Sequence, residues 1–139
     1  MGFFSTLFGT DSKKSAALNG LDIMDAINAH VKWKLRLEKY LGGTSEESLD
    51  PRVICLDDQC ALGKWIHGTA YEQFQGDQGF DTLRDDHANF HLVASKIVSL
   101  VQQNDKSGAE ALLKSDYMNA SRRVVHDLTE LNKQLGREP

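Results

Sequence analysis

The sequence predicts an all-α protein: a four-helix bundle with an additional short helical segment. Apolar residues recur at spacings of three, four and seven along most of the chain, which is the period of a helix with one buried face. Few segments have the β-branched and aromatic composition of strands. The 139 residues are enough for one domain with its own core. We therefore expect one helical domain over residues 14–139, preceded by a tail over residues 1–13.

The tail is short and apolar, and its lysines follow the apolar residues instead of preceding them. If the tail coils into a helix, one small apolar face consists of Phe3, Phe4, Leu7 and Phe8. Such a tail is disordered, docks on its own domain, or contacts a partner or a membrane surface. Gly2 and Thr6 fit the myristoylation pattern, which is weak evidence for a lipid anchor. A secretory signal has the opposite order of charge, so we expect a cytoplasmic protein.

The first long helix is predicted over about residues 15–41, and Gly42 and Gly43 should end it. Its apolar stripe contains Ile23, Ile27, His30, Leu37 and Leu41. Three further apolar residues are expected to widen this stripe, namely Met24, Val31 and Leu35. The pattern therefore directs one histidine of this helix toward the core.

The middle of the chain is predicted to hold a short helix between two loops. The first loop covers residues 44–51, and the second covers about residues 76–79. Asp57 is expected to cap a short helix that begins near Asp58. Gly68 should end or bend this helix.

Two further long helices are predicted, over about residues 81–103 and 108–135, with a break at residues 104–107. The buried stripe of the first contains Leu83, His87, Phe90, His91, Ala94, Ile97, Val98 and Val101. The buried stripe of the second contains Leu113, Tyr117, Ala120, Val124, Leu128, Leu131 and Leu135. With the first helix and the short segment, they complete the predicted bundle.

The composition argues against several classes of protein. The formal net charge is -4 and no basic face is evident, so we expect no nucleic-acid partner. No apolar run is long enough to cross a bilayer. Two cysteines, Cys55 and Cys60, do not make a disulfide framework. A reducing compartment also suits a cysteine that binds a metal.

Two histidines, His87 and His91, stand four residues apart on one apolar stripe. Residues at i and i+4 share a helix face, so their imidazoles can hold one cation. Without a metal, burying unpaired ring nitrogens would cost about 1–3 kcal/mol per group. A metal removes this cost for one nitrogen of each ring. The pair alone is a weak signal, because two hydrogen-bonded core histidines give the same pattern.

A buried metal needs more than two ligands, and structural zinc takes four in a tetrahedron. His30 lies on the stripe of the first helix, and Cys60 lies near the start of the short helix. A helix N-terminus stabilises a thiolate through its free N–H groups and its dipole. Three helical segments can then close one site around His30, Cys60, His87 and His91.

Four other side chains are expected to have structural roles. Cys55, in an apolar run, is expected to be a buried and inert thiol. His126 is expected at the surface or boundary of the last helix, and Trp33 and Trp65 are expected in the core.

Three motifs follow one another along the chain: 29-AHVKWKLRL-37, 60-CALGKWIHG-68 and 87-HANFH-91. Their combination resembles the chemoreceptor zinc-binding (CZB) domain family, and the resemblance covers about residues 17–132. It implies a helical bundle with one zinc ion held by three histidines and one cysteine, which here are His30, Cys60, His87 and His91.

Other residues of the family pattern are expected to pack around the site, namely Trp33, Leu62, Gly63, Lys64, Trp65 and Phe90. His67 departs from the pattern, because an aromatic or apolar residue is more usual there. We expect it at an exposed helix end, although its closeness to Cys60 would let it compete for the metal.

The resemblance also implies a regulatory or sensory module of bacterial signalling, related to chemotaxis or to cyclic-di-GMP. Such domains are usually attached to chemoreceptors or diguanylate cyclases, whereas this chain has no room for those partners' domains. We therefore expect a free-standing bacterial member that pairs as a homodimer or binds a chemoreceptor or diguanylate cyclase-type protein. Its stimulus is expected to be the zinc level or oxidation of Cys60.

An enzyme is the rival class, and the sequence argues against it. A zinc hydrolase keeps one coordination position open for water, which four protein ligands would close. The metalloprotease motif has Glu directly after its first His, where this chain has Ala88. A di-iron bundle needs inward carboxylates, and Lys34 stands four residues after His30. The alternative to a sensor is therefore a structural zinc-containing adaptor protein.

Overall fold

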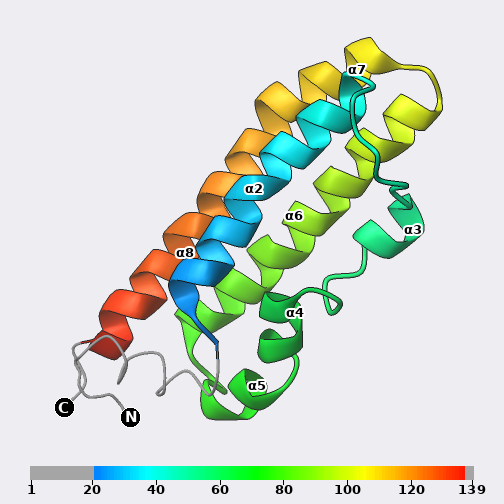
Figure 1. The fold of residues 1–139 in the computed structure, drawn as a ribbon. Coiled ribbons are helices and arrows are strands. Elements are labelled where there is room, and N and C mark those ends of the chain that lie inside the picture. Colours follow the sequence, from blue (N-terminus) through cyan, green and yellow to red (C-terminus); the bar gives the residue numbers. More distant parts are fainter. Residues whose placement is uncertain (1–20, 137–139) are drawn as a thin grey trace.

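The computed structural model of the chain describes residues 21–136. Within this range the chain forms helices joined by loops and no strand, which confirms the all-α prediction. Three long rods lie side by side (Figure 1). They are α2 (Ile23–Leu41), α6 (Gln78–Gln102), and a third rod formed by α7 (Lys106–Leu112), the π-helical turn η1 (Leu113–Tyr117) and α8 (Met118–Gly136). The expected tail of residues 1–13 lies outside the described residues.

Three short helices lie beside the rods where the sequence predicted one (Figure 1). They are α3 (Pro51–Ile54), α4 (Ala61–Ile66) and α5 (Thr69–Gln73). The first was missed: Asp50 caps it by accepting from the N–H of Arg52 at 2.9 Å, and Pro51 stands at its first position. Gly68 separates α4 from α5, as predicted. The expected fourth helix is therefore divided into short segments.

Aspartate caps decide where the long helices begin. Asp22 accepts from the N–H of Asp25 at 3.1 Å, so α2 begins at Ile23, later than predicted. Asp77 accepts from the N–H of Phe80 at 3.0 Å, so α6 begins at Gln78, earlier than predicted. The predicted starts of these two helices did not include the caps, whose oxygens satisfy N–H groups of the first turn.

The last rod is not the single helix that was predicted. It begins at Lys106, after a break at Asn104, whose φ of 64° lies in the left-handed region that asparagine tolerates. Residues 113–117 then form a π-helical turn before α8 starts. The hydroxyl of Ser115 donates to the carbonyl of Ala111 at 2.8 Å, a bond that competes with regular helix hydrogen bonding.

The buried stripes of α6 and α8 agree with the predicted ones, except that Val101 is half-buried and the side chain of Leu135 lies outside the described part. The predicted stripe of α2 was too wide. Met24, Val31 and Leu35 are 58%, 53% and 54% exposed, because α2 packs on α6 and α8 through its other face. Periodicity locates an apolar face but does not say whether a neighbour covers it.

Aromatic rings attach the short helices to the start of α6. Trp65 lies 5.9 Å from Phe74 and 6.3 Å from Phe80, and these two phenylalanine rings stack at 5.7 Å between centroids. All three are buried, so the cluster fixes α4 against α6. Trp33 was also expected in the core but is half-buried, with the guanidinium of Arg36 3.8 Å from its ring centroid.

Candidate metal centre

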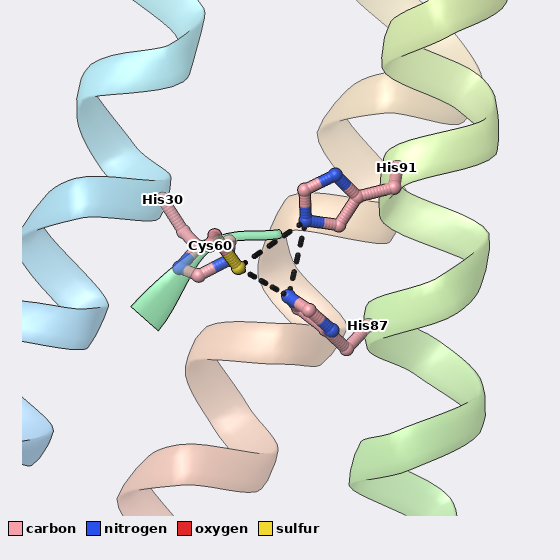
Figure 2. A group of neighbouring side chains, drawn as sticks. All are labelled: His30, Cys60, His87 and His91. Atoms are coloured by element: carbon pink, nitrogen blue, oxygen red, sulfur yellow. Dashed lines mark hydrogen bonds between the residues drawn. The ribbon is translucent and has the colours of Figure 1, made fainter. Parts of the chain in front are cut away.

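Four side chains from three separate segments meet between the helices, as Figure 2 shows. His30 comes from α2, Cys60 stands directly before α4, and His87 and His91 come from α6. One ligand atom from each lies within 4.8 Å of the others. The three histidines are 2%, 0% and 4% exposed, whereas Cys60 is half-buried. The structure thus brings together all four residues that the sequence pointed to.

The ligand atoms of Cys60, His87 and His91 are separated by distances typical of atoms that bind one ion. The Sγ of Cys60 lies 3.3 Å from Nε2 of His87 and 3.6 Å from Nε2 of His91, and these two nitrogens are 3.1 Å apart. A tetrahedral zinc ion, with bonds of about 2.3 Å to sulfur and about 2.0–2.1 Å to nitrogen, has edges of about 3.3–3.6 Å. A single zinc ion therefore fits among these three atoms with little movement.

Hydrogen bonds from two of the rings leave their other nitrogen free to bind a metal. The Nδ1–H of His30 donates to the carbonyl of Ala26 at 2.7 Å, and the Nδ1–H of His91 donates to the carbonyl of Ile54 at 2.9 Å. The lone pair of each ring is then on Nε2. Nε2 of His30 is buried and has no hydrogen-bond partner among the described residues. A cation at the centre would satisfy it.

His87 differs from His30 and His91 in the surroundings of its second ring nitrogen, Nδ1. Its Nε2 faces Cys60 and His91, while its Nδ1 is buried without a hydrogen-bond partner in residues 21–136. The ring is fully buried, and it contacts His30 edge-to-face at 5.2 Å between centroids. Packing, more than an outer hydrogen bond, therefore orients this ligand.

Cys60 is the N-cap of α4, so the prediction that Asp57 caps a helix beginning near Asp58 is wrong. The N–H of Gly63 donates to Sγ at 3.3 Å. Gly63 lies so close to Asp57 that a Cβ built on it would be 1.7 Å from the carbonyl oxygen of Asp57. The loop before α4 therefore folds tightly over the helix start, which aims the thiol at the histidines.

Burial keeps the histidines neutral, which is the form that binds metals. It lowers the pKa of His30 and His91 from the usual value and lowers that of His87 to about 2. Burial also raises the pKa of the Cys60 thiol, and this outweighs the N–H of Gly63, which lowers it. The helix N-terminus alone therefore does not produce the thiolate expected from the sequence. The charge of a bound metal would do so.

His67 and His126 lie away from the ligand cluster, as expected. His67 is the exposed C-cap of α4, and its Nε2 lies 3.1 Å from Oδ2 of Asp57. His126 is exposed on α8. Neither belongs to the group of side chains that meets at the centre.

Cys55 is half-buried, not buried as predicted. Its Sγ donates to the carbonyl of Arg52 at 3.4 Å. In the apolar run around it only Ile54 is buried, and Val53 and Leu56 are 52% and 45% exposed. The short helix α3 presents one face to α6, so an unbroken apolar run cannot be buried as a whole.

The model of the chemoreceptor zinc-binding domain family matches residues 30–98. This range is narrower than the resemblance suggested, yet it contains all four clustered side chains. Comparisons with curated proteins and with solved structures give no match. Domains of this family bind zinc, have regulatory roles, and occur with chemoreceptors and diguanylate cyclases. Residues 30–98 therefore form a domain of the chemoreceptor zinc-binding family.

Proposed function

We propose that His30, Cys60, His87 and His91 bind one zinc ion and that the domain is a zinc-dependent sensory module of bacterial signalling. The observation that carries this proposal is the convergence of four ligand atoms within 4.8 Å. One sulfur and three imidazole nitrogens form a donor set that suits zinc. The family match supports the same metal.

Four protein ligands favour regulation over catalysis. A hydrolytic zinc site needs a position for water, and four protein ligands would leave none in a tetrahedral site. The alternative is a structural adaptor, whose zinc would stay bound at all times. Exchange of the ion at physiological free zinc separates the two, because a sensor must gain and lose its metal.

Zinc would connect helices that are otherwise joined through packing and a few hydrogen bonds, such as that from Gln102 of α6 to the hydroxyl of Tyr40 of α2. The ligands attach α2, the start of α4 and the middle of α6 to one point. The rods also share a buried apolar core, including Leu128, Val124 and Ile97. Loss of zinc should therefore loosen the arrangement around α4 without unfolding the domain.

The proposed output is a change in association, with a second copy or with a chemoreceptor or diguanylate cyclase-type protein. The exposed apolar face of α2, defined by Met24, Val31 and Leu35, supports pairing. Beside it lies a groove of about 530 Å³ between α2 and α8, lined in part by Val31, Met118 and Val125. A second copy on this side would complete a bundle around the three rods. Membrane contact through residues 1–13 and a cytoplasmic location stay predictions.

Light scattering should detect a homodimer of the zinc-loaded protein that weakens when a chelator removes the metal. Val31→Glu should shift the protein to monomers and retain zinc, because it places a charge in the proposed apolar interface. Lys32→Glu is the matched control, since it changes an exposed neighbour on the same helix. Equal masses for the wild type and Val31→Glu would contradict pairing through this face.

Oxidation of Cys60 is the second proposed input. A zinc-bound cysteine is a thiolate, and oxidants such as hypochlorous acid convert thiolates to sulfenic acid or beyond. Treating the zinc-loaded protein with limiting oxidant should modify Cys60 before Cys55. Zinc release should follow the same time course as the modification of Cys60. Peptide mass spectrometry and a zinc-sensitive dye would follow the two events. Modification of Cys55 first, with zinc retained, would contradict this role.

A further inference from the structure

A surface hollow of about 430 Å³ reaches the metal centre from one side. Its lining includes two of the four ligands, Cys60 and His91. Trp33 and Arg36 of α2 form part of its wall, and Glu47 of the following loop forms another part. The hollow therefore lies between α2, the loop after it, and the ligands.

The centre is closed on its other sides. His30 and His87 are buried and do not line this hollow, and His91 is also buried. Cys60 is the half-buried member of the set. An ion that moves between the centre and solvent therefore has its shortest path past the Sγ of Cys60.

Arg36 and Glu47 form a clasp at the wall of this hollow. One guanidinium nitrogen of Arg36 lies 2.6 Å from Oε1 of Glu47, and its Nε donates to Oε2 at 3.1 Å. The same guanidinium stacks on Trp33 at 3.8 Å from the ring centroid. Such a two-point pair has the fork geometry that arginine forms and lysine does not. The clasp thus attaches the loop after α2 to α2 itself.

The clasp is an exposed attachment of residues 42–59, part of which lines the hollow. Two inner hydrogen bonds attach this segment to α6: the carbonyl of Leu49 accepts from Gln102 at 2.8 Å, and that of Ile54 accepts from His91 at 2.9 Å. The clasp side chains are 41% and 40% exposed, so water competes for them. Local opening should therefore begin at the clasp.

We propose that zinc enters and leaves through this hollow and that the clasp of Arg36, Glu47 and Trp33 sets the exchange rate. This inference rests on the proposed zinc ligands and assigns them a regulated access route. Opening the clasp widens the hollow above Cys60 without removing any ligand. The clasp therefore changes how fast zinc moves and not how many ions bind.

Stopped-flow capture of zinc by an excess of chelating dye would test the route on the full chain. Arg36→Ala and Glu47→Ala should each release zinc roughly three- to tenfold faster than the wild type. This is the effect expected when an exposed ion pair with a stacked guanidinium is removed. The double variant should release zinc no faster than the faster of the two single variants, because each single substitution already breaks the same clasp. Arg36→Lys should release zinc at a rate between those of the wild type and Arg36→Ala, because lysine keeps the positive charge but cannot form the two-point pair.

Lys133→Ala is the matched control, because Lys133 is exposed on α8, forms its own ion pair with Glu130 and does not line the hollow. Metal analysis should give one zinc per chain for every variant, and circular dichroism should give equal helix content. Equal release rates for the wild type and the clasp variants, or the same acceleration in the control, would overturn the route. A wild type that binds no zinc would instead overturn the proposed function itself.

Discussion

Replacing His87 or Cys60 by alanine should remove zinc from the purified protein. His87 is fully buried and its Nε2 is 3.3 Å from the sulfur, so no neighbouring side chain can take its place without rearrangement. Loss of an outer-shell partner alone weakens metal binding about 10–100-fold, so loss of a direct ligand should exceed about 100-fold. Metal analysis and competition with a chelating dye would measure the change.

Two histidine variants provide the controls for this experiment. His67→Ala and His126→Ala should keep one zinc per chain, because both side chains are exposed and stand apart from the cluster. Circular dichroism would establish that His87→Ala remains helical. Unchanged zinc in both His87→Ala and Cys60→Ala would exclude the proposed ligand set.

Gly63→Ala should damage both stability and zinc binding although it replaces none of the four proposed ligands. Its Cβ would lie 1.7 Å from the carbonyl oxygen of Asp57 and 2.7 Å from the carbonyl carbon. Both are backbone atoms, so no side-chain rotation relieves the overlap, and the loop before α4 must move. That movement would also break the bond from the Gly63 N–H to Cys60. We expect a loss of about 3 kcal/mol or more in the free energy of unfolding and weaker zinc binding.

Urea unfolding with and without zinc would measure both effects of Gly63→Ala. Gly79→Ala is the control, because its Cβ meets only the side chain of Asp77, at 3.2 Å, in the first turn of α6. It should change stability by no more than about 1 kcal/mol, since alanine also favours the helix. If the two variants unfold alike and bind zinc alike, the tight packing at Gly63 has no role in placing Cys60.

The long helices could be predicted because their signals are local. In α6, apolar residues at helical spacing define one face, and His87 and His91 belong to that face whatever packs against it. The same holds for His30 on α2. The four candidate ligands were therefore predicted from the pattern together with the family motifs.

The short segments were predicted less well because their ends depend on contacts with distant residues. Cys60 caps α4 because the chain brings Asp57 close to Gly63. The spacing of residues along the sequence does not predict this close contact. The π-helical turn in the last rod has no apolar signature either. Helical periodicity predicts on which face of its helix a residue lies, but it does not predict where the next segment of the chain packs.

The amino-acid sequence by itself determined the helical class through apolar residues at helical spacing. It also indicated the four candidate ligands and zinc through residue type together with the family motifs. The tertiary structure decided that the four ligand atoms lie within 4.8 Å, that Met24, Val31 and Leu35 are exposed, and that Arg36 meets Glu47 above the site. Those features depend on which segments pack together, and packing between residues far apart in the chain is a property of the whole fold.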